Sequence, residues 1–263
     1  MRYKLGISTC PNDTFMFHAL LEKRVLCEGF ELDIELMDVQ QLNEGLERGD
    51  FSFSKASCYG AVLMRDRFEV CGSGAALGYG VGPLILARQG APALDVNARV
   101  LAPGRMTTAF MLFRYFFPSA SNVSHVIFSG IMAALQQGEA DYGIVIHEGR
   151  FTYQESGLEL FADLGALWER TFSVPLPLGC IVADRTISQE HRAEFVSAVR
   201  RSIEYAYAHK EETLPTMRRY AQELDDSVIW KHVDLYVNEW SLDLGDQGRE
   251  AFEIFQRIAS SSR

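Results

Sequence analysis

Titratable and hydrogen-bonding side chains follow directly on a short apolar run near the middle of the chain. Residues 143–146 are apolar and mostly β-branched, which predicts a buried strand, and the run ends in His147-Glu148-Gly149-Arg150. In open α/β sheets, ligands bind in the crevice at the carboxyl ends of the strands. A histidine there can accept or donate a proton near neutral pH, because its ordinary pKa is about 6.5. His147 is therefore a candidate acid–base residue; the alternative is a histidine whose hydrogen bonds are satisfied within its own loop.

Two further groups of donors occupy similar positions. A predicted strand over residues 51–57 ends in Lys55-Ala56-Ser57, which suits a ligand carboxylate or hydroxyl. After a short predicted strand at 100–102, a Pro-Gly turn leads into a helix whose start carries Thr107-Thr108-Ala109. Backbone N–H groups, the helix dipole and two hydroxyls together favour an anion there. The alternatives are a solvated lysine and a threonine that only caps its helix.

The loop at residues 8–13 has the same placement. It follows a predicted strand at 3–8 and precedes a helix that Asn12 or Asp13 can cap. A helix that starts directly after a strand leaves backbone N–H groups facing any ligand at the strand's end. A ligand site and a plain helix cap both fit this loop.

These side chains must be positioned by a chain in which strands and helices alternate. Such alternation predicts a largely parallel sheet with helices on both faces. Beyond the elements above, strands are expected at 30–37, 68–71, 84–87, 122–128 and 180–184, and helices at 40–49, 58–64, 110–117, 130–138, 164–170, 188–209, 211–224, 226–237 and 246–258.

Glycine-rich and proline-rich crossings near 79–83 and 174–179 interrupt this alternation. We expect them to join two lobes, one made of residues 1–82 and 178–263 and the other of residues 83–177. A ligand cleft would lie between the lobes, and the chain would end in a helical tail.

Composition limits the partners. The chain has 263 residues, of which 48% are hydrophobic, enough for a sizeable core. The net charge of −10 argues against a general affinity for nucleic acid or anionic membranes. No apolar segment is long enough to span a membrane and residues 1–4 contain no apolar signal region, so we expect a cytoplasmic protein. The sequence leaves the oligomeric state open, a homodimer included.

Metal and disulfide chemistry has little support. The five cysteines include no C-x-x-C pair and are expected to be reduced thiols. The six histidines lack metal-binding spacings such as H-E-x-x-H, so we expect no metal. His191, His209 and His232 fall in the C-terminal helices, mostly among charged residues, where solvated roles are expected.

At the same stretches the sequence resembles the 1,4-dihydroxy-6-naphthoate synthases of the futalosine route to menaquinone. The resemblance spans residues 10 to 179 in order, and its first and fifth motifs are quite specific. The motifs are Cys10-Pro11-Asn12-Asp13-Thr14-Phe15, Lys55-Ala56-Ser57, the glycine-rich run 74–83, Pro103-Gly104 with Thr107-Thr108-Ala109, His147-Glu148-Gly149-Arg150-Phe151-Thr152-Tyr153, and Pro175-Leu176-Pro177-Leu178-Gly179. Thr9 departs from the proline expected before Cys10.

The resemblance implies a two-lobed α/β fold like that of type-II periplasmic binding proteins, and a carbon–carbon lyase that needs no cofactor. The implied reaction converts cyclic dehypoxanthine futalosine, a small carboxylated substrate, into 1,4-dihydroxy-6-naphthoate and a sugar-derived fragment. In the family the histidine of the H-E-x-R-F-T-Y motif is the proposed base, here His147. Substrate contacts carry over to Lys55, Ala56, Ser57, Thr107, Thr108, Ala109 and, as a weaker transfer, Asn43. We add the expectation that the helix start at Thr107-Thr108 binds the naphthoate carboxylate.

Two other functions stay open. One is chorismate dehydratase, the sister enzyme of the same route and fold, against which the His-Glu-Gly-Arg-Phe-Thr-Tyr run argues. The other is a solute-binding, sensor or cytosolic carboxylate-binding protein without catalysis, which needs no base in its cleft.

Overall fold

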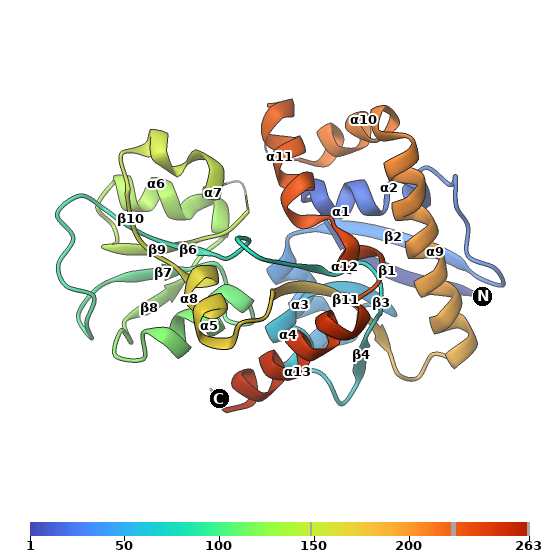
Figure 1. The fold of residues 1–263 in the computed structure, drawn as a ribbon, viewed down its shortest axis with the longest axis horizontal. Coiled ribbons are helices and arrows are strands. Elements are labelled where there is room, and N and C mark those ends of the chain that lie inside the picture. The colour runs from blue at the N-terminus through green and yellow to red at the C-terminus, as the bar shows by residue number, and fades with distance from the viewer. Residues whose placement is uncertain (148, 222–224, 262–263) are drawn as a thin grey trace.

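The computed structural model describes residues 1–147, 149–221 and 225–261; Glu148, the end of the helix predicted at 211–224, and residues 262–263 lie outside them. Within these ranges the strands form two sheets, which lie side by side in Figure 1. The six-stranded first sheet has the order β2-β1-β3-β11-β4, with β5 paired to β11. The five-stranded second sheet has the order β10-β6-β9-β7-β8.

The strands agree with the predicted positions to within a few residues, apart from β5 and β10, which were not predicted as strands. Those of the first sheet are β1 (Arg2–Ser8), β2 (Glu31–Met37), β3 (Phe53–Ser57), β4 (Phe68–Val70), β5 (Ala76–Gly78) and β11 (Leu176–Asp184). Those of the second sheet are β6 (Leu84–Ala87), β7 (Val100–Ala102), β8 (Val123–His125), β9 (Tyr142–Val145) and β10 (Glu159–Asp163).

Helices cover both sheets, and the C-terminal ones gather on the side of the first sheet (Figure 1). They are α1 (Pro11–Met16), α2 (His18–Leu21), α3 (Val39–Arg48), α4 (Cys58–Leu63), α5 (Thr108–Phe116), α6 (Ile131–Gln136), α7 (Gly149–Thr152), α8 (Leu164–Phe172), α9 (Gln189–Ala208), α10 (Lys210–Tyr220), α11 (Asp226–Tyr236), α12 (Glu239–Leu242) and α13 (Gly245–Ser261). In the described part of the chain, none of them is both long and apolar enough to cross a membrane.

Both sheets are mixed, so the expectation of a largely parallel sheet is wrong. β1 pairs in parallel with β2 and β3, but β11 runs antiparallel to β3, β4 and β5. In the second sheet β7 is parallel to β8 and β9, whereas β6 is antiparallel to β9 and β10. The reason is topological: β11 brings the chain back from the second sheet, so it enters the first sheet against the direction of its neighbours.

The chain passes between the sheets twice, once between β5 and β6 and once between α8 and β11. The strands of the second sheet all fall between residues 84 and 163. The first passage packs closely against the start of α8, since a Cβ atom on Gly82 would lie 2.2 Å from the Cα of Gly165. The lobe boundaries proposed from the sequence stay a prediction.

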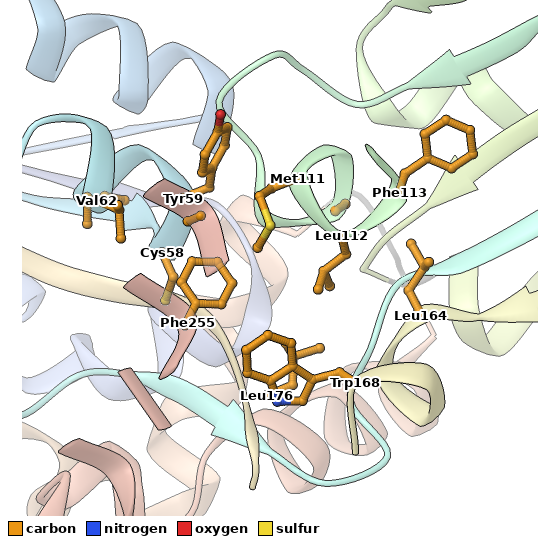
Figure 2. Close-up of a cluster of buried hydrophobic side chains, with 14 of the residues drawn as sticks. Cys58, Tyr59, Val62, Met111, Leu112, Phe113, Leu164, Trp168, Leu176 and Phe255 are labelled. Atoms are coloured by element: carbon orange, nitrogen blue, oxygen red, sulfur yellow. The ribbon is translucent and has the colours of Figure 1, made fainter. Parts of the chain in front are cut away.

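One hydrophobic cluster joins the two sheets beside these passages. It contains buried residues of α4, α5, α8 and β11, together with α13 from the end of the chain, as Figure 2 shows. The rings of Trp168 and Phe255 lie 5.7 Å apart between centroids, which links α8 to α13. Burial of these large side chains holds the C-terminal helix against both the first sheet and the second passage.

Candidate functional site

A pocket lies between the two sheets, and about 730 Å³ of space, part of it open solvent, lies within it. All four strand-end stretches singled out in the sequence contribute to its wall. Their lining residues are Ser8, Asn12, Asp13, Lys55, Ser57, Thr107, Thr108, Ala109, His147 and Arg150. The remainder of the wall is largely apolar, from Val39, Val81, Pro83, Ile146 and Leu178, and so can pack against a ring system.

His147 follows the end of β9 and lies in the pocket wall. Its backbone adopts a left-handed conformation, with φ of +56°, which is uncommon outside glycine and costs on the order of 1–3 kcal/mol. The ring faces the loop between β1 and α1: the Sγ of Cys10 lies 3.3 Å from its Nδ1. A strained strand-end backbone thus presents an imidazole across the gap between the sheets.

Asp141 anchors the strand that carries His147. Its buried carboxylate accepts hydrogen bonds from the Arg99 backbone N–H and guanidinium and from the Arg88 guanidinium, at 2.9–3.1 Å. Hydrogen bonding to Arg99 is the main cause that holds the Asp141 pKa well below its ordinary value. The start of β9 is therefore fixed by a charge-assisted network outside the pocket.

We expect Asp141→Asn to lower the free energy of unfolding by about 2–3 kcal/mol at pH 7. Because the folded-state pKa of Asp141 is depressed, its contribution is complete above the ordinary carboxyl value of about 4 and is lost as the pH falls further. The gap between wild type and variant should therefore narrow below about pH 4. Urea unfolding at pH 7 and at low pH measures the difference in free energy of unfolding, with Glu139→Gln as an exposed control. A difference that does not change with pH would contradict a stabilising role for the ionised Asp141 carboxylate.

Lys55 and Asp13 form a buried ion pair at the pocket wall. The Lys55 Nζ lies 2.6 Å from Asp13 Oδ1, and the two side chains are 6% and 0% exposed. Asp13 also accepts hydrogen bonds from the Ser8 hydroxyl and from Asn12 Nδ2. The prediction that Asn12 or Asp13 caps the following helix is wrong, because Cys10 is the N-cap of α1 and Asp13 turns toward β1 and β3 instead.

Ser57, Asn43 and Ala56 differ in their relation to the pocket. The Ser57 hydroxyl lines it but caps α4, donates to the Met106 carbonyl oxygen and accepts from Asn43 Nδ2. Asn43 is fully buried and holds Ser57 from behind, through its side chain and the Ser57 backbone N–H. Asn43 and Ala56 are absent from the lining, so any role they have in substrate binding is exerted from behind the wall.

The start of α5 lines the pocket, but its two hydroxyls are already used. Thr107 donates to the Gly104 carbonyl oxygen at 2.8 Å and caps the helix, and Thr108 donates to the Leu178 carbonyl oxygen at 2.9 Å. In this arrangement the two hydroxyls donate to the protein's own carbonyl oxygens, and their role as anion donors stays a prediction. The N–H groups of Thr108 and Ala109 have no acceptor among the described residues and remain available to a ligand.

His232 is a pocket residue that the sequence reasoning placed in solvent. It lies on α11, is 2% exposed, and its ring stacks on that of His147 at 6.1 Å and 11°. The prediction failed because residues 226–237 carry several charges, although Ile229, Val233 and Tyr236 mark a buried face at helical spacing. His232 falls on that face, which was the available signal. His209 is exposed, as predicted, and His191 is partly buried and hydrogen-bonds the Tyr3 hydroxyl.

Metal-binding groups do not gather in the described part of the chain: no cluster of three or more His, Cys, Asp or Glu side chains there could hold an ion. The guanidinium of Arg150, which lines the pocket, is tied to the Gly82 carbonyl oxygen and to Asp163 at 2.9 Å. The site therefore offers a lysine, helix N–H groups and two imidazoles around an apolar wall. Such a site suits a ring-containing carboxylate and can move a proton.

Sequence comparison points to one family. A family model described as menaquinone biosynthesis matches residues 3–261. The chain is 45% identical to 1,4-dihydroxy-6-naphthoate synthase of Thermus thermophilus, over 94% of this chain and 90% of the relative. It is 38% identical to the protein of the same name from Streptomyces coelicolor, over 94% and 89%. The resemblance noted from the motifs is thereby confirmed.

Comparison with solved structures confirms the predicted fold. A protein of Archaeoglobus fulgidus superimposes with a TM-score of 0.93 at 27% identity, covering 99% of this chain and 97% of the other. The periplasmic aliphatic sulphonate-binding protein SsuA of Escherichia coli gives a TM-score of 0.64 at 14% identity, covering 97% and 87%. The second likeness establishes the periplasmic-binding-protein-like fold and nothing about the ligand.

Proposed function

The chain belongs to the menaquinone-biosynthesis family, and from that membership we propose that it converts cyclic dehypoxanthine futalosine into 1,4-dihydroxy-6-naphthoate. The reaction is a carbon–carbon lyase step that also releases a sugar-derived fragment. The observation that carries the proposal is the position of His147, at a strand end in the wall of the pocket and facing the loop between β1 and α1. A binding protein has no need of a strained imidazole at that place.

His147 acts in this proposal as the general base. It removes a substrate proton that a neighbouring carbonyl makes acidic, and the electron pair left on carbon drives cleavage of a carbon–carbon bond. Formation of the aromatic naphthalene ring makes the step favourable. The apolar wall that includes Val81, Ile146 and Leu178 packs against this ring and excludes water from the base.

The substrate carboxylate has two candidate partners in the same pocket. Lys55 supplies a cation whose Nζ donates to Asp13 and retains further N–H groups for a ligand. The start of α5 supplies the N–H groups of Thr108 and Ala109 and the positive end of the helix dipole. Either contact opposes the net charge of −10, which would otherwise disfavour an anionic substrate.

Incubation of the purified protein with cyclic dehypoxanthine futalosine tests the proposal, with the products identified by mass. We expect 1,4-dihydroxy-6-naphthoate without any added metal or cofactor. Turnover of chorismate instead would favour the sister dehydratase. Tight binding of the substrate without any product would favour a carboxylate-binding protein of the same fold.

A further inference from the structure

His232 occupies a position that the proposed reaction does not yet use. It reaches the pocket from α11, close to the end of the chain, and its ring lies near those of His147 and Tyr236, at 6.1 and 4.6 Å between centroids. Its Nε2 lies 3.0 Å from Asn12 Oδ1. Its Nδ1 is buried and has no hydrogen-bond partner among the described residues.

A chain of hydrogen bonds fixes which nitrogen of His232 carries the proton. The Asp13 carboxylate is surrounded by donors, among them Lys55 Nζ at 2.6 Å and Ser8 Oγ at 2.6 Å. Asn12 must therefore turn its NH₂ group toward Asp13, and it does so at 2.9 Å. This leaves Asn12 Oδ1, which can only accept, facing Nε2 of His232. Nε2 is thus the protonated nitrogen.

The remaining nitrogen of His232 is consequently an acceptor. Burial, followed by the nearby His147 and Lys55, lowers the pKa of His232 well below its ordinary value, so the ring is neutral. A neutral ring protonated on Nε2 carries a lone pair on Nδ1. A buried acceptor without a partner destabilises the folded protein, and such groups in native proteins usually have a ligand or water as partner.

We propose that Nδ1 of His232 accepts a hydrogen bond from a hydroxyl group of the bound ligand, and so selects hydroxylated ring compounds over plain aromatic carboxylates. The ligand class rests on the proposed function, because the pocket's product there carries two ring hydroxyls beside a carboxylate. His232 is in this view a specificity residue that works beside the base and does not replace it. Lys55 and Asp13 contribute by holding Asn12 in the orientation that places the proton of His232 on Nε2 and leaves its Nδ1 unprotonated.

A comparison of two ligands and two variants tests this inference by calorimetry, without turnover. The ligands are 1,4-dihydroxy-6-naphthoate, kept anaerobic against oxidation, and 2-naphthoate, which has the same ring and carboxylate but no hydroxyls. His232→Gln places an amide near the Nε2 position and loses the acceptor at Nδ1, whereas His232→Asn places an amide oxygen near Nδ1. We expect His232→Gln to weaken dihydroxynaphthoate binding about tenfold and to leave 2-naphthoate within about twofold, with His232→Asn closer to wild type.

The outcomes separate the inference from the function on which it rests. Equal losses for both ligands in His232→Gln, or no loss for either, would overturn the hydroxyl contact while the wild-type protein still converts its substrate. A His232→Asn variant as selective in its loss as His232→Gln would overturn it too. A wild-type protein that binds neither naphthoate and converts no substrate would overturn both proposals. Thermal unfolding of each variant verifies that it is folded.

Discussion

His147→Ala is expected to lower kcat by about 10²–10⁴-fold, because a positioned general base contributes that much to proton abstraction. The affinity for 1,4-dihydroxy-6-naphthoate should change little, since Lys55, the α5 N-terminus and the apolar wall remain in place. Single-turnover rates with cyclic dehypoxanthine futalosine and calorimetry with the product measure the two effects separately. The combination distinguishes loss of a base from loss of a binding contact.

His209→Ala provides the matched control for this substitution. His209 is an exposed histidine at the end of α9, whose Nδ1 lies 3.0 Å from the carbonyl oxygen of Tyr205. Its removal should leave kcat and product affinity unchanged. If His147→Ala kept a kcat within a few-fold of wild type, the base would have to be another group, and His232 would be the first candidate because its ring stacks on that of His147.

Asp13→Asn is expected to lower the free energy of unfolding by about 3–5 kcal/mol, because it leaves the buried Lys55 ammonium without its counter-charge. The same change leaves one acceptor oxygen for the donors of Ser8, Lys55 and Asn12, so Asn12 is held less firmly and binding of dihydroxynaphthoate should weaken as well. Urea unfolding measures the free energy of unfolding, and calorimetry with the product measures the affinity for dihydroxynaphthoate. Such a cost is a large part of the stability of a typical domain.

Two comparisons isolate the buried charge as the cause. Glu35→Gln removes one partner of the Lys4–Glu35 pair, whose Nζ–Oε1 distance of 2.8 Å is similar but whose side chains are about 40% exposed; it should cost less than about 1 kcal/mol. The double variant Asp13→Asn with Lys55→Met should recover part of the lost free energy of unfolding, because no unpaired charge then remains buried. Ligand binding should not recover. If Asp13→Asn and Glu35→Gln lowered the free energy of unfolding equally, the buried Lys55–Asp13 pair would not be the stabilising interaction described above.

The sequence alone determined most of the elements, although not β5 and β10, and the stretches that meet in the pocket. Each of the four stretches lies at or shortly after the carboxyl end of a strand, and such an end is a local feature that an apolar or alternating run and the polar group at its end reveal. His147, Lys55 and Thr107 could thus be assigned to one cleft from residue order alone. The motifs also pointed to the family, because they preserve residue types in order along the chain.

The tertiary structure decided which hydrogen-bond partners those residues have and which residues from distant parts of the sequence join them in the pocket. The hydroxyls of Thr108 and Ser57 donate hydrogen bonds to the carbonyl oxygens of Leu178 and Met106, respectively, which are distant in sequence. β11 enters the first sheet antiparallel for a similar reason, since its direction depends on where the chain returns from. His232 reaches the pocket across 220 positions of sequence from Asn12, and no local pattern records such a partner. Periodicity describes which face of an element is buried, whereas the packing of whole elements determines what that face meets.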